Sequence, residues 1–178
     1  MDRDDLHALL SAVQRGELTI DDALARLRDL PFEDLGFARV DHHRALRNGF
    51  PEVILGEGKT PEQIVAIAER LAAHGANVLV TRLSAEAAQT LLAADPAFEY
   101  HRVPRLAIRR TKPAATSGRG TILVVSAGTA DLPVAEEAAL SAEIMGNPID
   151  RLYDVGVAGL HRLLGERDRL WSASVLIV

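Results

Sequence analysis

The sequence predicts an α/β protein with a short helical segment at its N-terminus. Residues 121–178 follow the order strand, helix, strand, helix, strand, and residues 52–81 follow the order strand, helix, strand. The run 121–125 is apolar or β-branched and leads through a turn of small residues into a helix start, as buried parallel strands do before a crossover helix. We therefore expect a small α/β unit followed by a doubly wound parallel sheet.

Composition excludes several classes of function. The net charge of −5 argues against nucleic acid or an anionic membrane as the main partner. The absence of cysteine leaves no disulfide, thiolate metal site or thiol nucleophile within these residues. The sequence shows no signal-peptide pattern and no apolar run long enough to span a bilayer. We therefore predict a cytoplasmic protein without a nucleic-acid or membrane partner.

The first 31 residues are expected to form a helical segment. Apolar residues recur at helical spacing from Leu6 to Val13, and Gly16 separates them from a second helix that starts near Thr19 and runs toward Leu30. No residue here suggests chemistry. We interpret residues 1–31 as a helical hairpin that packs on a neighbouring unit or a sister subunit.

Residues 32–110 are interpreted as a small α/β domain. Thr60 and Pro61 predict a helix start, with Thr60 as the N-cap and Pro61 in the first turn. Gly75 is expected to close that helix. The predicted strands are 52–55, 77–81, 100–103 and 105–108, and a further helix is predicted at 85–94. The stretch 111–120, rich in Pro, Gly, Ser and Thr, is expected to be a linker.

Two polar stretches in this domain are candidate binding residues. Arg44, Arg47 and Lys59 are expected to contact an anion or a substrate. The adjacent His42 and His43 beside Asp41 could instead bind a metal, although neighbouring side chains point in different directions in regular structure. The turn at residues 56–59 resembles the end of a phosphate-binding loop but lacks the full spacing of an ATP site.

The turn after the strand at 121–125 is the main candidate site. Ser126, Thr129 and Asp131 supply polar side chains at the carboxyl end of a predicted strand, where open α/β sheets bind ligands. Gly128 allows the backbone to approach a ligand, and the free N–H groups of the following helix favour an anion such as phosphate. An ordinary turn capped by Asp131 is the alternative.

A second polar pair follows the next predicted strand. His161 and Arg162 come after the predicted strand at 149–155, so they should lie beside Asp131 at the same edge of the sheet. A helix at 134–145, a short Leu-rich helix and a last strand at 171–178 complete residues 121–178. Because the chain stops within an apolar run, we expect this sheet to be truncated at Val178 and to continue in further strands.

These residues resemble a known family. The motif S-A-G-T-A-D-L-P at 126–133 is similar to the G-S-x-S-D-W motif of the phosphoribosylaminoimidazole carboxylase (PurE-like) superfamily, and A-G-L-H-R at 158–162 is similar to its S-A-H-R turn. Stretches 34–44, 49–60 and 153–164 together resemble the LarB family, the first enzymes of nickel-pincer cofactor biosynthesis. The resemblance covers essentially the whole chain.

The resemblance implies a carboxylase-hydrolase. Such an enzyme adds CO2, supplied as CO2 or bicarbonate, to C5 of the pyridinium ring of nicotinic acid adenine dinucleotide. It also hydrolyses the phosphoanhydride, which yields AMP and pyridinium-3,5-biscarboxylic acid mononucleotide. Because a pyridinium carbon is electrophilic, a nucleophile must first add to the ring. The family implies a cysteine, whose position would lie beyond Val178, so these residues alone are expected to be inactive.

The resemblance also implies roles for individual residues. Asp131 becomes the acid-base candidate for the proton of C5. The hydroxyls of Ser126 and Thr129 would hold a phosphate or carboxylate, and His161 and Arg162 would contact phosphate. The substrate-binding residues suggested by the LarB-like stretches are Asp41, His42, Arg44, Glu57 and Lys59. A magnesium ion at the pyrophosphate is chemically reasonable, and no organic cofactor is expected.

Assembly and two alternative functions complete the expectations. PurE-like domains form octamers, so the resemblance implies a homo-oligomer and favours an octamer. An aminoimidazole ribonucleotide carboxylase or mutase of purine synthesis would share the two turns but would not need the residues before Gly118. A non-catalytic nucleotide-binding module is the other alternative, which the absence of the nucleophile supports.

Overall fold

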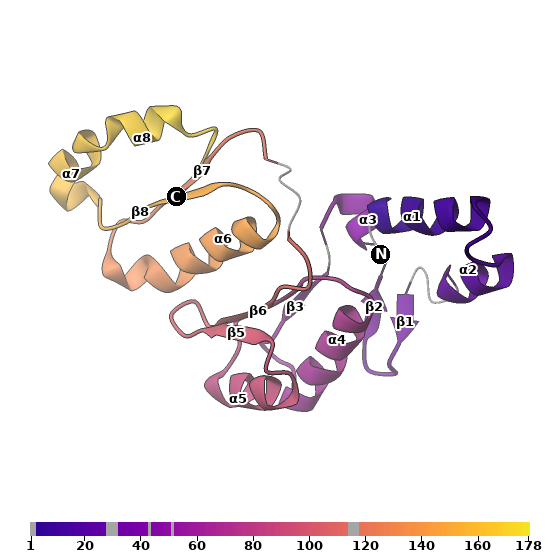
Figure 1. The fold of residues 1–178 in the computed structure, drawn as a ribbon. Coiled ribbons are helices and arrows are strands. Elements are labelled where there is room, and N and C mark those ends of the chain that lie inside the picture. Colours follow the sequence, from indigo (N-terminus) through magenta and orange to yellow (C-terminus); the bar gives the residue numbers. More distant parts are fainter. Residues whose placement is uncertain (1–2, 28–31, 43, 51, 114–117) are drawn as a thin grey trace.

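The computed structural model describes residues 3–27, 32–42, 44–50, 52–113 and 118–178 and confirms the α/β class (Figure 1). In the described ranges we find no helix with the length and apolar character that crossing a membrane requires. The helices are α1 Arg3–Gln14, α2 Ile20–Leu27, α3 Arg44–Asn48, α4 Pro61–Ala73, α5 Ala85–Ala94, α6 Leu132–Ile144, α7 Leu160–Gly165 and α8 Arg167–Ser172. The strands are β1 Phe32–Asp34, β2 Arg39–Asp41, β3 Val53–Leu55, β4 Val78–Thr81, β5 Phe98–His101, β6 Leu106–Arg109, β7 Ile122–Val125, β8 Ile149–Leu152 and β9 Val175–Ile177.

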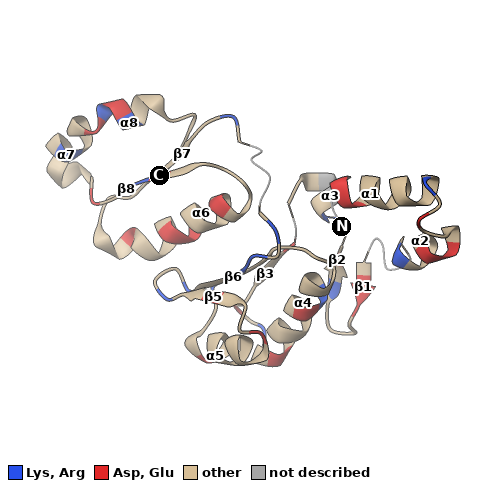
Figure 2. Ribbon diagram, in the orientation of Figure 1, with Lys and Arg blue, Asp and Glu red and all other residues tan. Residues whose placement is uncertain are grey.

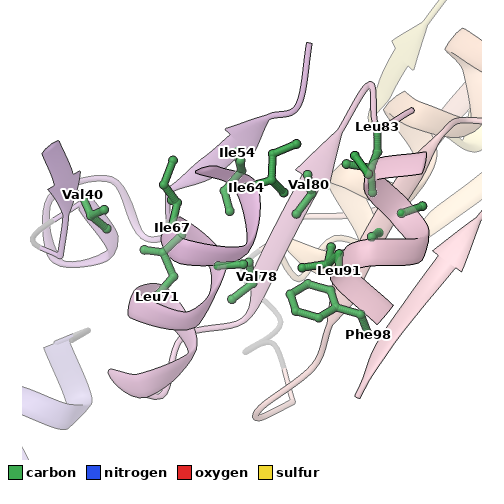
Figure 3. Packing of buried hydrophobic residues seen from close by; sticks show 14 residues of the cluster. Val40, Ile54, Ile64, Ile67, Leu71, Val78, Val80, Leu83, Leu91 and Phe98 are labelled. Carbon is green, nitrogen blue, oxygen red and sulfur yellow. The ribbon is translucent and has the colours of Figure 1, made fainter. Parts of the chain in front are cut away.

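The first sheet is mixed and has the strand order β3-β4-β6-β5. β3 and β4 are parallel, whereas β6 runs antiparallel to both β4 and β5. Helices α4 and α5 cover one face and enclose the cluster drawn in Figure 3, which includes Ile64, Leu71 and Leu91. The predicted start of α4 is confirmed, because the Thr60 side chain accepts from the Gln63 N–H in a capping box.

The second sheet is fully parallel and has the order β8-β7-β9. Strand β7 is central because it pairs with β8 on one side and β9 on the other, and its side chains are buried on both faces. Val124 packs with Ala135 and Ala139 of α6, while Leu123 and Val125 pack in a cluster that also receives side chains from α7 and α8. From β7 the chain runs through α6 to β8 on one side of β7. It then runs through α7 and α8 to β9 on the other side of β7, which is the doubly wound connection expected from the sequence.

Helix α6 also packs on the mixed sheet, a contact that the sequence did not predict. Leu140 and Ile144 of α6 form a buried cluster with three residues of the mixed sheet, Leu79, Leu106 and Ile108. These sheet residues alternate with those beneath α4 and α5, so α6 covers the opposite face. The predicted domain division at residues 1–31, 32–110, 111–120 and 121–178 stays a prediction.

Several predicted boundaries are wrong. Trp171 was placed in the last strand, but it lies in α8 and is 85% exposed, and β9 begins only at Val175. The hairpin strands β5 and β6 were predicted with a one-residue turn, whereas the turn occupies residues 102–105. The β1–β2 hairpin and α3 were not predicted at all. Leu30, His43 and residues 114–117 of the predicted linker lie outside the described residues.

Candidate functional site

The turn after β7 carries the main predicted site. Residues 129–131 form a single 3-10 turn, and α6 begins directly after it at Leu132. The Gly128 N–H donates to Asp131 Oδ2 over 2.9 Å, so Asp131 does cap this turn, as the alternative interpretation expected. No hydrogen bond of Oδ1 of Asp131 occurs within the described residues, and the residue is exposed. The cap and a chemical role are therefore compatible.

Ser126 combines burial with an unsatisfied hydroxyl. The residue is 6% exposed, and its Oγ has no hydrogen-bond partner among the described residues. By the alternation of β7, Ser126 follows Val124 on the face that α6 covers. Buried hydroxyls are normally hydrogen-bonded, because an unpaired one costs free energy. A ligand oxygen beneath the first turn of α6 would satisfy this group.

The turn after β8 lies directly against the turn after β7. The Val155 N–H donates to the Ser126 carbonyl over 3.2 Å, and the Gly156 N–H donates to the Ala127 carbonyl over 2.9 Å. The structure therefore brings together the two turns that the sequence analysis placed at one edge of the sheet. The first turn carries Ser126, Gly128, Thr129 and Asp131, whereas His161 and Arg162 lie in α7, which follows the second turn and the 3-10 helix at residues 157–159.

The side chain of Arg162 has a partner within the protein, whereas that of His161 is exposed. Arg162 NH1 forms an ion pair with Asp154, whose backbone has a positive φ of 60°. Gly159 leaves room for this guanidinium, because an added Cβ would lie 2.5 Å from Arg162 Nε. His161 lies in α7 and is exposed. Arg162 is thus positioned by the protein, whereas His161 faces solvent.

If these two turns form an active site, Gly156→Ala should lower the turnover of its substrate about 100-fold, because small displacements of a catalytic group have effects of that order. The new Cβ would lie 2.9 Å from the Ala127 carbonyl oxygen, so the two turns would have to separate. The φ of Gly156 is −60°, which alanine tolerates, so the effect comes from the clash. Turnover and unfolding midpoints would be compared with Gly165→Ala, where no atom lies within 4 Å. Equal turnover of the two variants contradicts the prediction.

Arg82 links the glycine-bearing turn at residues 56–59 to α6, because it contacts acidic side chains of both. The Gly56 N–H donates to the Thr81 carbonyl over 2.8 Å, and Glu57 pairs with Arg82 at 3.4 Å. Arg82 Nε also lies 3.8 Å from Glu137 of α6. Lys59 Nζ donates to the Leu55 carbonyl over 2.9 Å. Sequence reasoning missed Arg82, since nothing in the sequence distinguishes an arginine with a positive φ of 51°.

His42 lies elsewhere, in a buried cluster at the other end of α4. Its ring stacks on His74 with the centroids 3.8 Å apart, and its Nε2 lies 3.4 Å from Glu33 Oε2. Arg70 Nε is 3.4 Å from the same carboxylate. A helix of 13 residues is roughly 20 Å long, so α4 separates His42 from Lys59. Within one chain, the structure does not bring these two predicted site residues together.

The His42 cluster predicts a pH dependence of stability. Burial lowers the pKa of His42, the His74 ring lowers it further, and Glu33 opposes both effects. Because the folded-state pKa lies below the unfolded value of about 6.5, the unfolded chain binds more protons below that pH. The free energy of unfolding should therefore fall as pH decreases below about 6.5. Arg70 and the N-terminal ammonium are further positive charges near this cluster.

Urea unfolding at pH 7.5 and 5.5 would measure this effect. We expect His42→Gln to reduce the pH dependence, whereas His7→Gln on the exposed face of α1 should leave it unchanged. Identical pH dependence in the wild-type protein and His42→Gln would contradict the assignment.

Asp41 and Arg44 lie near the start of the mixed sheet. The Asp41 N–H donates to Glu52 Oε2 over 2.7 Å. The Arg44 guanidinium lies 5.9 Å from the Phe50 ring centroid, and its Nε is buried without a hydrogen-bond partner in the described ranges. The side chain of Arg47 is not described. No three His, Cys, Asp or Glu side chains of the described chain are grouped to hold a metal, and His43 lies outside the described residues.

A cleft of about 610 Å³ lies at the opposite end of α6 from these turns. Its lining includes Asn77, Arg110, Lys112, Glu143 and Asn147. The charged groups are already paired, Arg110 with Glu99 and Glu143, and Lys112 with Asp5. Pro148, which also lines the cleft, directly precedes β8. The cleft therefore opens near the amino end of that strand, away from the edge where parallel sheets bind ligands.

The middle of the chain matches a known protein family. Residues 32–111 match the family described as LarB/PurE-like N-terminal domain. The chain is also similar to an uncharacterized protein of Methanocaldococcus jannaschii, with 29% identity over 180 residues. That similarity spans 97% of this chain and 70% of the relative.

Proposed function

We propose that the protein carboxylates a pyridinium dinucleotide. The match of residues 32–111 to the LarB/PurE-like N-terminal domain supports a carboxylase-related enzyme. The substrate is nicotinic acid adenine dinucleotide, and CO2 or bicarbonate supplies the carboxyl group. Hydrolysis of the phosphoanhydride releases AMP and leaves pyridinium-3,5-biscarboxylic acid mononucleotide. In this proposal the product serves nickel-pincer cofactor biosynthesis.

The observation that supports this proposal is the hydrogen-bonded pair of turns at the carboxyl ends of β7 and β8. The chain passes from β7 to α6 on one face and enters β9 from the other, so the turn after β7 lies at the switch point of the sheet. Ligands of open α/β sheets bind at such points. The N–H groups at the start of α6 and the Arg162 guanidinium add positive potential that suits a phosphate.

The side chains there divide into binding and proton-transfer roles. Ser126 offers an unpaired hydroxyl, Thr129 is exposed in the same turn, and His161 is exposed in α7. Arg162 would exchange its contact with Asp154 for a phosphate, since a guanidinium can bind two oxygens at once. These residues would hold the nicotinate mononucleotide half of the substrate.

Asp131 is assigned to the proton of C5. When the C5–carboxyl bond forms, C5 must lose its hydrogen as a proton, and a carboxylate within reach can accept it. In the second reaction a water oxygen attacks phosphorus, the bridging P–O bond breaks, and AMP leaves. The 178 residues contain no cysteine, so we assign them binding and proton transfer and not the nucleophilic addition that must precede carboxylation.

A magnesium ion, the oligomeric state and the cellular location are separate questions for the proposed enzyme. The described residues form no group of three carboxylate or imidazole ligands, so no step is assigned to a magnesium ion. We propose a homo-oligomer, with an octamer as the first state to test by light scattering. A cytoplasmic location remains a prediction.

The test uses the complete natural protein, incubated with nicotinic acid adenine dinucleotide and ¹³C-bicarbonate. Mass spectrometry should detect AMP together with a labelled dicarboxylated mononucleotide. AMP without the labelled product would show a pyrophosphate-cleaving enzyme and contradict the carboxylase proposal. If neither product forms but aminoimidazole ribonucleotide raises the melting temperature, the purine-pathway alternative takes precedence.

A further inference from the structure

Three loops lie side by side at the carboxyl end of β3 and β4. The Gly56 N–H donates to the Thr81 carbonyl over 2.8 Å, which joins the loop after β3 to the end of β4. The Leu83 N–H donates to the Arg105 carbonyl over 2.7 Å, which joins the loop after β4 to the β5–β6 turn. This edge of the mixed sheet is separate from the turns after β7 and β8, and the carboxyl ends of parallel strands are where open α/β sheets bind ligands.

This edge carries positive charge that the protein does not neutralise. Most arginines of the mixed-sheet unit pair with acidic side chains, as Arg70, Arg109 and Arg110 do. Arg102 and Arg105 are exposed, and in the described part of the chain neither has an acidic partner within 4.0 Å. Figure 2 shows basic residues in this turn, although the chain as a whole has a net charge of −5.

The basic turn is compact and firmly attached. The Arg105 N–H donates to the Arg102 carbonyl over 3.3 Å, so one four-residue turn places the two Cα atoms within about 7 Å. Arg82 and Arg105 have positive φ values of 51° and 50°, a conformation that costs non-glycine residues free energy and is frequent at ligand sites. Such strain persists only where surrounding contacts maintain it.

A buried imidazole nitrogen lies beside this turn. His101 Nε2 is buried and has no hydrogen-bond partner in the described ranges, and the nearest carboxylate oxygen, from Glu99, is 4.0 Å away. His101 pairs with Leu106, whose side chain packs with α6, so His101 lies on the same face of the sheet as α6. It is therefore available to a ligand bound between the turn and α6.

The edge and the proposed active site lie toward the same end of α6. Arg82 Nε is 3.8 Å from Glu137, and Asp131 precedes Glu137 by six residues, or about 9 Å along a helix. Arg82 is already paired with Glu57 and Glu137, so its role is to position the loops. Lys59 Nζ uses one donor on the Leu55 carbonyl and keeps two for a ligand.

We propose that Lys59, Arg102 and Arg105 bind the phosphate of the adenylate half of the dinucleotide. The inference rests on the proposed function for the identity of the nucleotide, but the phosphate site itself follows from the loops. The site would hold AMP after the phosphoanhydride is cleaved, so AMP alone should bind there.

Isothermal titration of the complete protein with AMP, without bicarbonate, tests this site. We expect the double variant Arg102→Gln/Arg105→Gln to weaken AMP binding about tenfold or more, because two charge-assisted contacts are lost. The control Arg15→Gln/Arg26→Gln removes the same charge from the N-terminal region and should change affinity less than about twofold. Unfolding midpoints would show that both variants fold.

The outcomes separate this inference from the proposed function. Equal AMP affinity of wild type and the Arg102/Arg105 variant, or no AMP binding by wild type, overturns the phosphate site even if the carboxylated product forms. Loss of AMP affinity in that variant without any carboxylated product supports the site and contradicts the carboxylase. A loss of equal size in the Arg15/Arg26 control would show a general charge effect and overturn the inference.

Discussion

Asp131→Asn is expected to lower turnover of nicotinic acid adenine dinucleotide by at least about 100-fold, the usual effect of removing a general acid or base. The amide oxygen of asparagine can still accept the Gly128 N–H, which now donates to Asp131 Oδ2 over 2.9 Å. The turn should therefore persist. An amide cannot accept the proton of C5 at neutral pH, so the loss should appear in kcat, with KM nearly unchanged.

Steady-state kinetics with detection of the carboxylated product would measure this effect. Asp21→Asn, on the exposed face of α2, removes the same charge far from the turns and should retain wild-type turnover. If Asp131→Asn also retains it, Asp131 serves only as a cap. Asp131→Ala would distinguish the two roles further, because it removes the cap as well and should also lower the unfolding midpoint.

Leu106→Ala is expected to lower the free energy of unfolding by about 2–5 kcal/mol. Leu106 is 0% exposed and packs in the cluster that joins the mixed sheet to Leu140 and Ile144 of α6. Truncation would leave a cavity between two rigid elements, so the surrounding side chains could close it only in part. The same cavity should weaken the contact of α6 with the sheet.

Urea unfolding and hydrogen exchange of the α6 amides would test this prediction together. Leu164→Ala makes the same change at a residue that is 55% exposed. It should lower the free energy of unfolding by less than about 1 kcal/mol. If Leu106→Ala were as mild as Leu164→Ala, the α6 contact with the mixed sheet would contribute little to stability. Faster exchange in α6 alone would show local detachment of the helix.

Local sequence signals predicted the elements whose ends are set by short-range contacts. Thr60 and Pro61 marked the start of α4, and the predicted helix at 85–94 agrees with the bounds of α5. Capping and helix propensity act within one turn of the chain, so a sequence window contains the necessary information. Trp171 was misplaced because an apolar residue near a strand fits either a strand or an amphipathic helix.

The candidate site was only partly predictable for a related reason. The two turns after β7 and β8 were expected to meet because parallel strands align their carboxyl ends, and the Gly156–Ala127 hydrogen bond joins them. His42 and Lys59 were grouped because both lie in the LarB-like stretches, yet α4 separates them in space. Arg82 and Arg105 gave no signal, because their positive φ values arise from contacts between loops distant in sequence.

The sequence by itself determined the α/β class, the strand–turn–helix units and the polar residues at the strand ends. These features depend on hydrophobic periodicity, caps and glycine turns, which are local properties of the chain. Only the tertiary structure decided that α6 packs on the mixed sheet and that Arg102 and Arg105 lie toward the proposed active site. Such placement depends on which apolar faces are buried against one another, and Leu106 meets Leu140 only when α6 packs on the mixed sheet.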